Sequence, residues 1–171
     1  MRIAFIAAAV LFRLASLALS IRHERRLRAG GAAEYGAANT ALLALAHTAF
    51  YIAAIAEYAI GPARGIDALA LAGLALYGVG AAMLVVVIRG LGRLWTVKLL
   101  IARDHALVTT PLFRWVRHPN YLLNILPELV GFALALHATW TLAIGLPLYA
   151  VPLAIRIRQE EAAMRAVFPG Y

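Results

Sequence analysis

Long apolar runs recur along the chain, and each is bounded by charged residues, glycine or proline. An apolar helix of about 20 residues spans the roughly 30 Å hydrocarbon core of a bilayer, because each residue adds about 1.5 Å. The pattern predicts five membrane-spanning helices, at Ile3–Ser20, Ala41–Ile60, Ala68–Ile88, Tyr121–Leu136 and Thr139–Ile155. The last two runs are short and adjacent, which indicates a helical hairpin. We therefore predict an all-α fold, that of a polytopic integral membrane protein.

Polar segments separate these runs. Ile21–Asn39 is predicted to be a polar loop, and Asp67 is a predicted N-cap for the third span. The segment Arg89–His118 is the longest polar stretch, yet it is too rich in leucine, valine and tryptophan for a disordered linker. We expect it to lie at the membrane interface, with Trp95 and Trp115 at the level of the lipid headgroups.

The composition limits the number of domains. Hydrophobic residues make up 64% of the 171 residues and charged residues only 14%, which leaves no room for a separate soluble domain. We predict one domain, with a three-helix part at 1–90 and a cofactor-binding part at 91–171. The chain has no cysteine, which excludes disulfides and thiolate metal sites. The five histidines show no metal-ligand spacing, so no metal site is predicted.

The net charge of +8 is distributed unevenly along the chain. Thirteen of the sixteen lysine and arginine residues fall in segments that a five-span topology places on one side of the membrane. The positive-inside rule then predicts an outside N-terminus and a cytoplasmic C-terminus. The basic excess is interpreted as a signal of orientation, with some attraction to anionic membrane lipids, and not as a nucleic-acid-binding surface.

The sequence Arg117-His118-Pro119-Asn120-Tyr121 marks the start of the fourth span. Proline in the first helical turn places His118 in the N-cap region, where free N–H groups and the helix dipole favour an anionic group such as a cofactor carboxylate. Arg117 adds a charge-assisted hydrogen-bond donor. The alternative is an interfacial anchor, in which the same residues contact lipid headgroups.

Arg156 and Glu160 lie at i, i+4 spacing after the fifth span, so they share a face if the helix continues. In a functional interpretation, Glu160 accepts hydrogen bonds from a ribose or an amine, and Arg156 holds an acidic acceptor. The alternative is a solvated helix end with a weak ion pair. Both residues are predicted at the same end of the molecule as His118.

Four ionisable residues fall within or near the predicted spans, where charge is costly and each is therefore a candidate for function or pairing. We expect Arg13 and Glu57 to extend toward the headgroups. His47 is expected to form a hydrogen bond between helices. Glu128 follows Pro127 near the middle of the fourth span, and it is a candidate acceptor-site residue.

The run His105-Ala-Leu-Val-Thr-Thr-Pro-Leu-Phe-Arg-Trp-Val-Arg-His-Pro-Asn-Tyr121 resembles the signature of the isoprenylcysteine carboxyl methyltransferase family. The later run Arg156-Ile-Arg-Gln-Glu-Glu161 is similar to the C-terminal motif of that family, and the resemblance covers roughly Lys98–Ala163. It implies a membrane enzyme that transfers a methyl group from S-adenosylmethionine to a lipophilic acceptor. The N-terminal part is similar to a bacterial branch that O-methylates alkylpyrones or alkylresorcinols, which implies a bacterial inner-membrane protein.

The resemblance also assigns roles to residues. It implies that Arg156 is on the acceptor side, and that the cofactor is contacted by Lys98, His105, Ala106, Leu107, Val108, Phe113, His118, Pro119, Tyr121 and Glu160. According to the resemblance, His105 to Val108 contact the cofactor largely through backbone groups. The chain has Pro111 and Phe113 where members commonly have glycine and tyrosine, so the hydroxyl that the resemblance implies for one polar contact is absent at Phe113.

The reaction that the resemblance implies is an SN2 transfer, which needs donor and acceptor held in line. We expect the cofactor to enter from the cytoplasm and the acceptor from the bilayer. With a hydroxyl acceptor, Arg156 lowers the acceptor pKa, and Glu128 or His118 is a candidate base. Two alternatives remain: an NADPH-dependent sterol-type membrane reductase and a non-catalytic lipid-binding subunit. The sequence defines neither the acceptor nor the oligomeric state.

Overall fold

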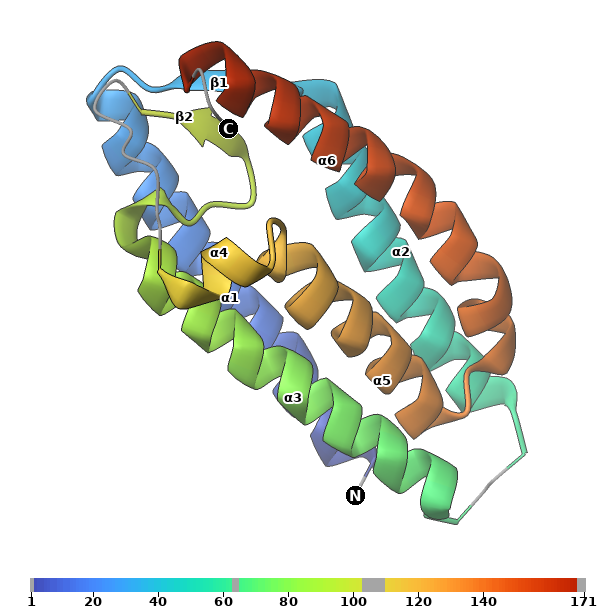
Figure 1. Cartoon of the computed structure of the whole chain (residues 1–171). Helices are drawn as coiled ribbons and strands as arrows, with labels where there is room; N and C mark the ends of the chain where they lie inside the picture. Colours follow the sequence, from blue (N-terminus) through green and yellow to red (C-terminus); the bar gives the residue numbers. More distant parts are fainter. Residues whose placement is uncertain (1, 63–64, 103–109, 169–171) are drawn as a thin grey trace.

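The computed structural model describes residues 2–62, 65–102 and 110–168, and nearly all of them are helical. Long helices α1, α2, α3 and α6 surround the shorter helix α5 (Figure 1). Two π-helical turns, η2 and η3, precede α5 and α6. The bounds in chain order are α1 Arg2–Ala29, β1 Ala33–Tyr35, α2 Ala37–Ile60, α3 Ala68–Leu91, η1 Gly92–Leu94, β2 Leu99–Ile101, α4 Pro111–Trp115, η2 Asn120–Ile125, α5 Leu126–Leu136, η3 Thr141–Gly145 and α6 Leu146–Val167.

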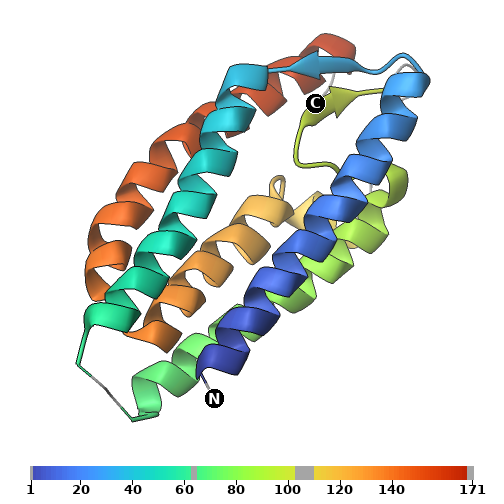
Figure 2. The ribbon, with the colours of Figure 1, turned by 180° about the vertical axis from the view of Figure 1, so that it is seen from behind.

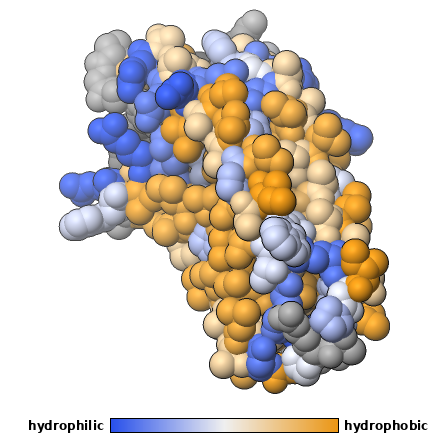
Figure 3. All heavy atoms as spheres, turned by 90° about the vertical axis from the view of Figure 1, so that its right-hand side faces the viewer, coloured by the Kyte–Doolittle hydropathy of each residue, from blue (hydrophilic) through white to orange (hydrophobic). Residues whose placement is uncertain are grey.

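The predicted all-α membrane fold is confirmed. Four helical segments are long and apolar enough to cross a bilayer, and a fifth, Asn120–Leu136, is shorter. Helix α1 begins at the end of the molecule opposite to the end at which α6 finishes (Figure 1). Apolar residues cover most of the middle of the face seen in Figure 3, and hydrophilic residues gather mainly toward its ends. This distribution is typical of an integral membrane protein.

The predicted loop at Ile21–Asn39 is wrong over much of its length, because α1 continues to Ala29. Residues in this stretch favour helix, and Arg28 Nε lies 2.8 Å from Glu24 Oε1 in an i, i+4 ion pair. The helix ends before Gly31, whose φ of 79° is readily adopted by glycine.

A short antiparallel pair of strands, which was not predicted, joins two distant segments. Ala33 in β1 lies opposite Ile101 in β2, so the connection after α1 is held against the segment that follows α3. All three residues of β2 are buried. Trp95 is also buried, at 4% exposure, where it packs near Leu84 and Val87. Trp95 therefore packs inside the protein and not against lipid headgroups, whereas Trp115 is 89% exposed.

Helix α5 lies between α3 on one side and α2 and α6 on the other (Figures 1 and 2). Glycines permit the close approach of α3 and α5. A Cβ atom added at Gly131 would lie 2.4 Å from the Tyr77 amide nitrogen, and one added at Gly73 would lie 2.3 Å from the Ala135 nitrogen. Phe132 and Leu129 of α5 are fully buried, so this central helix supplies much of the core.

Local signals also determine where three helices begin. The predicted N-cap is confirmed, because the Asp67 carboxylate accepts a hydrogen bond from the Ala70 amide at 2.9 Å. Pro127 and Pro147 each occupy the first turn of a helix directly after a π-helical turn. Proline lacks an N–H donor, and the wider turn before it accommodates the broken hydrogen-bond pattern.

Candidate functional site

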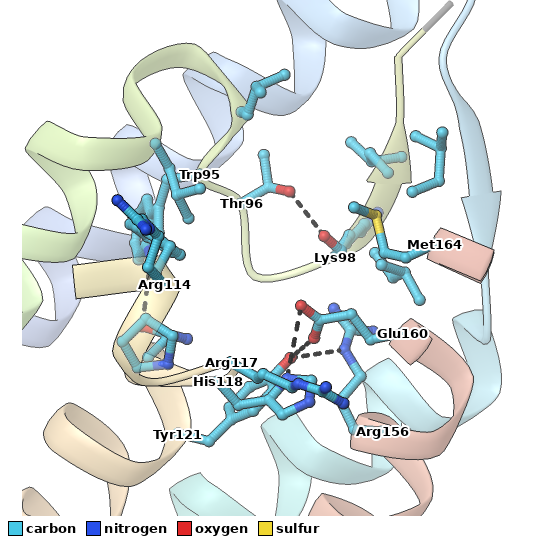
Figure 4. Close-up of a pocket in the computed structure, with 18 residues that line it drawn as sticks. Trp95, Thr96, Lys98, Arg114, Arg117, His118, Tyr121, Arg156, Glu160 and Met164 are labelled. Carbon is cyan, nitrogen blue, oxygen red and sulfur yellow. Dashed lines mark hydrogen bonds and ion pairs between the residues drawn. The ribbon is translucent and has the colours of Figure 1, made fainter. Parts of the chain in front are cut away.

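A cavity of about 340 Å³, named cavity 1 here, lies beside β2, α4 and the C-terminal half of α6 (Figure 4). The structure brings together there most of the residues that the sequence selected. These residues are Lys98, Phe113, His118, Pro119, Tyr121, Arg156 and Glu160. His105, Ala106, Leu107 and Val108 lie outside the described residues, so their predicted role remains a prediction.

Tyr121 connects Glu160 to Arg156 within cavity 1. Its hydroxyl donates a hydrogen bond to Glu160 Oε2 at 2.6 Å and accepts one from Arg156 Nε at 3.2 Å. The three side chains converge in Figure 4. Continuation of the helix places Arg156 and Glu160 on one face as predicted, and the tyrosine hydroxyl bridges them.

Arg156 is almost fully buried, with 3% of the residue exposed. Besides Tyr121, its guanidinium donates to Thr40 Oγ1 at 2.8 Å and to the Val97 carbonyl at 2.9 Å. Among the described residues, none of these hydrogen-bond partners is a carboxylate. A buried cation with neutral partners is stabilised by an anionic or electron-rich ligand, because burial removes the solvation that water would provide.

His118 occupies the start of the helix that follows Pro119, as predicted. Its carbonyl accepts hydrogen bonds from the amides of Tyr121 and Leu122, both at 3.1 Å. Its Nε2 lies 3.3 Å from Glu161 Oε1, and its ring stacks on Tyr121. In the part of the chain that is described, His118 Nδ1 is buried without a hydrogen-bond partner. The nearest carboxylate oxygen to this nitrogen is Glu160 Oε1 at 4.0 Å, which is too far for a hydrogen bond.

Lys98 and Phe113 contribute to the cavity wall in different ways. Lys98 Nζ donates to Glu24 Oε1 at 2.7 Å, which anchors the segment after α3 to α1. Phe113 packs against the end of α3, where its Cε2 atom would be 3.0 Å from a Cβ atom added at Gly90. Arg114 and Arg117 also line cavity 1, so cations outnumber carboxylates among the described residues that line it.

Glu128 lies away from cavity 1, fully buried in α5. It forms an ion pair with Arg13 and accepts a hydrogen bond from the Tyr51 hydroxyl. The expectation that Arg13 extends to the headgroups is therefore wrong, because pairing with Glu128 offsets the cost of burying both charges. His47 joins α2 to this pair, with Nε2 at 3.6 Å from Glu128 Oε1, a distance too long for a hydrogen bond.

Glu57 of α2, the other residue expected to extend toward the headgroups, binds the connection between α5 and α6. Its carboxylate accepts hydrogen bonds from the Trp140 and Thr141 amides at 2.9 and 2.8 Å. Glu57 therefore stabilises the connection between α5 and α6, and it lines neither cavity among those described here.

A second cavity of about 260 Å³, named cavity 2, lies among α1, α2, η2 and α6. Apolar side chains from all four segments line it, including Leu14, Leu43, Ile125 and Leu153. The two cavities share five lining residues, which we call the shared wall: Trp95, Thr96, Asn120, Tyr121 and Arg156. Sequence reasoning missed cavity 2 and the part played by Thr40, because neither depends on a local motif.

The fold and these adjoining cavities define a polytopic membrane protein with a polar pocket next to an apolar one. Residues 73–166 match the sequence model of the isoprenylcysteine carboxyl methyltransferase (ICMT) family. The chain belongs to this family, whose members are membrane methyltransferases that use S-adenosylmethionine.

Two relatives are similar over nearly the whole chain. An uncharacterized protein from Haemophilus influenzae is 48% identical over 157 residues, which cover 92% of this chain and 91% of the relative. The uncharacterized protein YpbQ from Bacillus subtilis is 28% identical over 166 residues, which cover 94% of each. No solved structure matches the chain.

Proposed function

We propose that this protein transfers a methyl group from S-adenosylmethionine, bound in cavity 1, to a lipophilic acceptor bound in cavity 2. The observation that carries the proposal is the shared wall, since Tyr121 and Arg156 face both cavities. Adjoining cavities can hold two reactants next to each other, and such positioning supplies much of the rate enhancement in group-transfer enzymes.

The residues of cavity 1 fit the methyl donor. The volume of about 340 Å³ lies within the range of small-molecule sites. The Glu160 carboxylate can accept hydrogen bonds from ribose hydroxyls or an amine, and the cations Arg114 and Arg117 suit a carboxylate. His118 Nδ1, which lies 4.0 Å from Glu160 Oε1, forms no hydrogen bond within the described part of the chain. The donor supplies an electrophilic methyl group on a positively charged sulfur.

Cavity 2 fits a lipophilic acceptor that arrives from the bilayer. Leu14 and Leu17 of α1 line it and are also 56% and 45% exposed on the apolar surface. Leu43 and Ala44 of α2 complete this side of the cavity. An acceptor can therefore pass between α1 and α2 while its apolar part stays out of water.

Arg156 orients the acceptor oxygen in this proposal. A guanidinium in a dry cavity stabilises an oxyanion strongly, so it favours the deprotonated form that attacks the methyl carbon. The acceptor oxygen forms its new bond as the carbon–sulfur bond breaks, and the positive charge of the sulfonium is neutralised. No metal is needed for this step.

A carboxylate acceptor arrives without a proton, whereas a hydroxyl acceptor must transfer one to a base. Of the two candidate bases, His118 lines cavity 1 and stacks on Tyr121 of the shared wall, whereas Glu128 lines neither cavity. We therefore favour His118 as the base for a hydroxyl acceptor. Prenylcysteine carboxylates, alkylpyrone hydroxyls and alkylresorcinol phenols all remain candidate acceptors.

Calorimetric titration of S-adenosylhomocysteine into detergent-purified protein tests the proposal. We expect saturable binding by the wild type and loss of binding in Glu160→Ala. Glu34→Ala is the matched control, because it removes a carboxylate from β1 that pairs with Arg28 and does not line cavity 1. Absence of binding by a folded wild-type protein would contradict the proposal.

A membrane reductase that uses NADPH is the second candidate, and one observation favours it. Arg114, Arg117 and Lys98 around cavity 1 would suit the phosphates of this cofactor. Titration of NADPH into the same preparation distinguishes the two functions, because only the reductase is expected to bind NADPH. A non-catalytic lipid-binding subunit would bind neither cofactor.

A further inference from the structure

Polar residues around cavity 2 form two layers that are separated by seven residues on each helix. The first layer is the hydrogen-bonded group of Thr40, Tyr121 and Arg156. The second contains His47, Glu128 and Tyr149, each seven residues from a member of the first. Helix α1 shows the same offset, because Ser20 accepts from the Val97 amide beside the first layer and Arg13 pairs with Glu128 in the second.

Seven residues correspond to about two helical turns, so residues at this spacing share a face and lie about 10 Å apart along the axis. Cavity 2 is lined by Thr40 and Arg156 of the first layer and by His47 and Arg13 of the second. It is therefore polar toward both ends, with leucines on the side between them. A purely hydrocarbon ligand segment does not match the end formed by the second layer.

His47 is a member of the second layer whose ring nitrogen Nε2 forms no hydrogen bond to the described residues. This buried nitrogen lies 3.6 Å from Glu128 Oε1, a distance too long for a hydrogen bond. The ring is held between Tyr51, with ring centroids 5.2 Å apart, and Tyr149, at 5.9 Å. Glu128 is already engaged by Arg13 and Tyr51. A buried polar atom without a partner is destabilising, so a ligand that supplies one gains affinity.

We propose that His47 binds a second oxygen of the acceptor, a hydroxyl or carbonyl group separate from the oxygen that is methylated. This inference rests on the proposed function and narrows the acceptor to an amphiphile with two oxygen functions on a compact head. The alkyl part leaves cavity 2 between α1 and α2, along Leu14 and Leu17, instead of extending past the second layer.

The test compares two probes in protein saturated with S-adenosylhomocysteine. A 5-alkylresorcinol carries two hydroxyls, and the 3-alkylphenol of the same chain length carries one. We expect the wild type to bind the resorcinol roughly tenfold more tightly, the effect of one hydrogen bond to an otherwise unpaired buried group. His47→Leu should bind the two probes alike, and His47→Gln should restore part of the difference.

Thr48→Val is the matched control, because Thr48 also lines cavity 2 but its hydroxyl already donates to the Ala44 carbonyl at 2.9 Å. This variant should keep the wild-type preference. Unchanged affinity for S-adenosylhomocysteine shows that each variant is folded. Equal binding of both probes by the wild type, a preference that survives in His47→Leu, or no binding of either probe would each overturn the inference. In all three cases, binding of S-adenosylhomocysteine leaves the proposed function standing.

Discussion

The hydroxyl of Tyr121 lies between a carboxylate and a guanidinium, and it is bonded to both. This arrangement orients Glu160 toward cavity 1 and leaves Arg156 at the wall that the two cavities share. One side chain thus couples the proposed cofactor site to the proposed acceptor site. The coupling predicts that changes at Tyr121 affect both ligands, whereas changes at Arg156 act mainly on the acceptor.

Replacement of Tyr121 by phenylalanine removes only the hydroxyl. We expect Tyr121→Phe to weaken binding of S-adenosylhomocysteine by roughly tenfold, because Glu160 loses the donor that orients it. Calorimetry on the detergent-purified variant measures the change. Affinity equal to that of the wild type would show that Glu160 does not need this hydrogen bond.

Replacement of Arg156 should affect the proposed acceptor site much more than the proposed cofactor site. Arg156→Ala and Arg156→Lys are both expected to lower kcat/KM for the acceptor by roughly 100-fold or more, since lysine lacks the planar fork that reaches Thr40, Val97 and Tyr121 together. Affinity for S-adenosylhomocysteine should change by much less. Full turnover by Arg156→Ala would exclude the proposed role of this residue.

At the scale of elements, the contact between α3 and α5 determines where the cavities can form. The glycines Gly73 and Gly131 bring the two backbones together, and no larger residue fits at either position without displacement. The turn before α5 carries Tyr121 and Asn120, so movement of α5 would move the shared wall.

We expect Gly131→Leu to lower the apparent Tm in detergent by several degrees or to prevent folding, because the added side chain meets the Tyr77 backbone. Gly78→Ala is the matched control on α3, since a Cβ atom there meets nothing within 4 Å. It should keep or slightly raise the Tm, because alanine favours helix over glycine. Equal Tm values for the two variants would contradict this packing.

The cap at the start of α3 predicts a pH dependence. The Ala70 amide, followed by the His137 side chain, holds the pKa of Asp67 below its ordinary value. A carboxyl group whose pKa is lowered in the folded state stabilises that state above its unfolded pKa, and this contribution is lost as pH falls through the folded value. We expect Asp67→Ala to lower the Tm at neutral pH, and the difference from the wild type to shrink below about pH 4. Thermal unfolding measured from pH 3 to pH 7 tests this, and a difference independent of pH would contradict it.

At the scale of the whole molecule, the distribution of cations predicts an orientation. The basic connections and cavity 1 belong to the same end, so we propose that this end faces the cytoplasm, where S-adenosylmethionine is available. The loop between α2 and α3 then lies outside. Trp115 and Trp140, which are 89% and 73% exposed, are suitable anchors at the two membrane interfaces.

The absence of native cysteine makes this orientation easy to test. Single cysteines at Gly65, in the outer loop, and at Val167, the last residue of α6, can be labelled with an impermeant maleimide in spheroplasts. We expect Gly65→Cys to react directly and Val167→Cys to react only after permeabilisation. The reverse pattern would invert the topology and place cavity 1 outside.

Local signals account for the parts of this protein that were predicted from sequence. Apolar runs identified the spans, Asp67 identified the start of α3, and Arg117 to Tyr121 identified the start of the fourth span. The Arg156 and Glu160 spacing was also informative, because a continuous helix carries both to the same face. Each of these features depends on residues that are close in the chain.

Features that join distant residues were not predicted. The pairing of β1 with β2 and the extension of α1 to Ala29 were missed, as was the burial of Trp95. Arg13 and Glu128 are 115 residues apart, and either could equally have faced lipid headgroups or another helix. Periodicity shows that a helix has a polar position, but it does not show which neighbouring helix that side chain contacts.

The sequence by itself determined that this chain is a helical membrane protein and that one end carries the polar chemistry. Hydrophobicity and charge act over one span at a time, so they can be evaluated without knowing the neighbours. Only the tertiary structure decided that Thr40, Tyr121 and Arg156 form one layer and that two cavities share a wall. These relations depend on the close packing of α3 against α5 and on the rotation of each helix about its axis, which local sequence does not define.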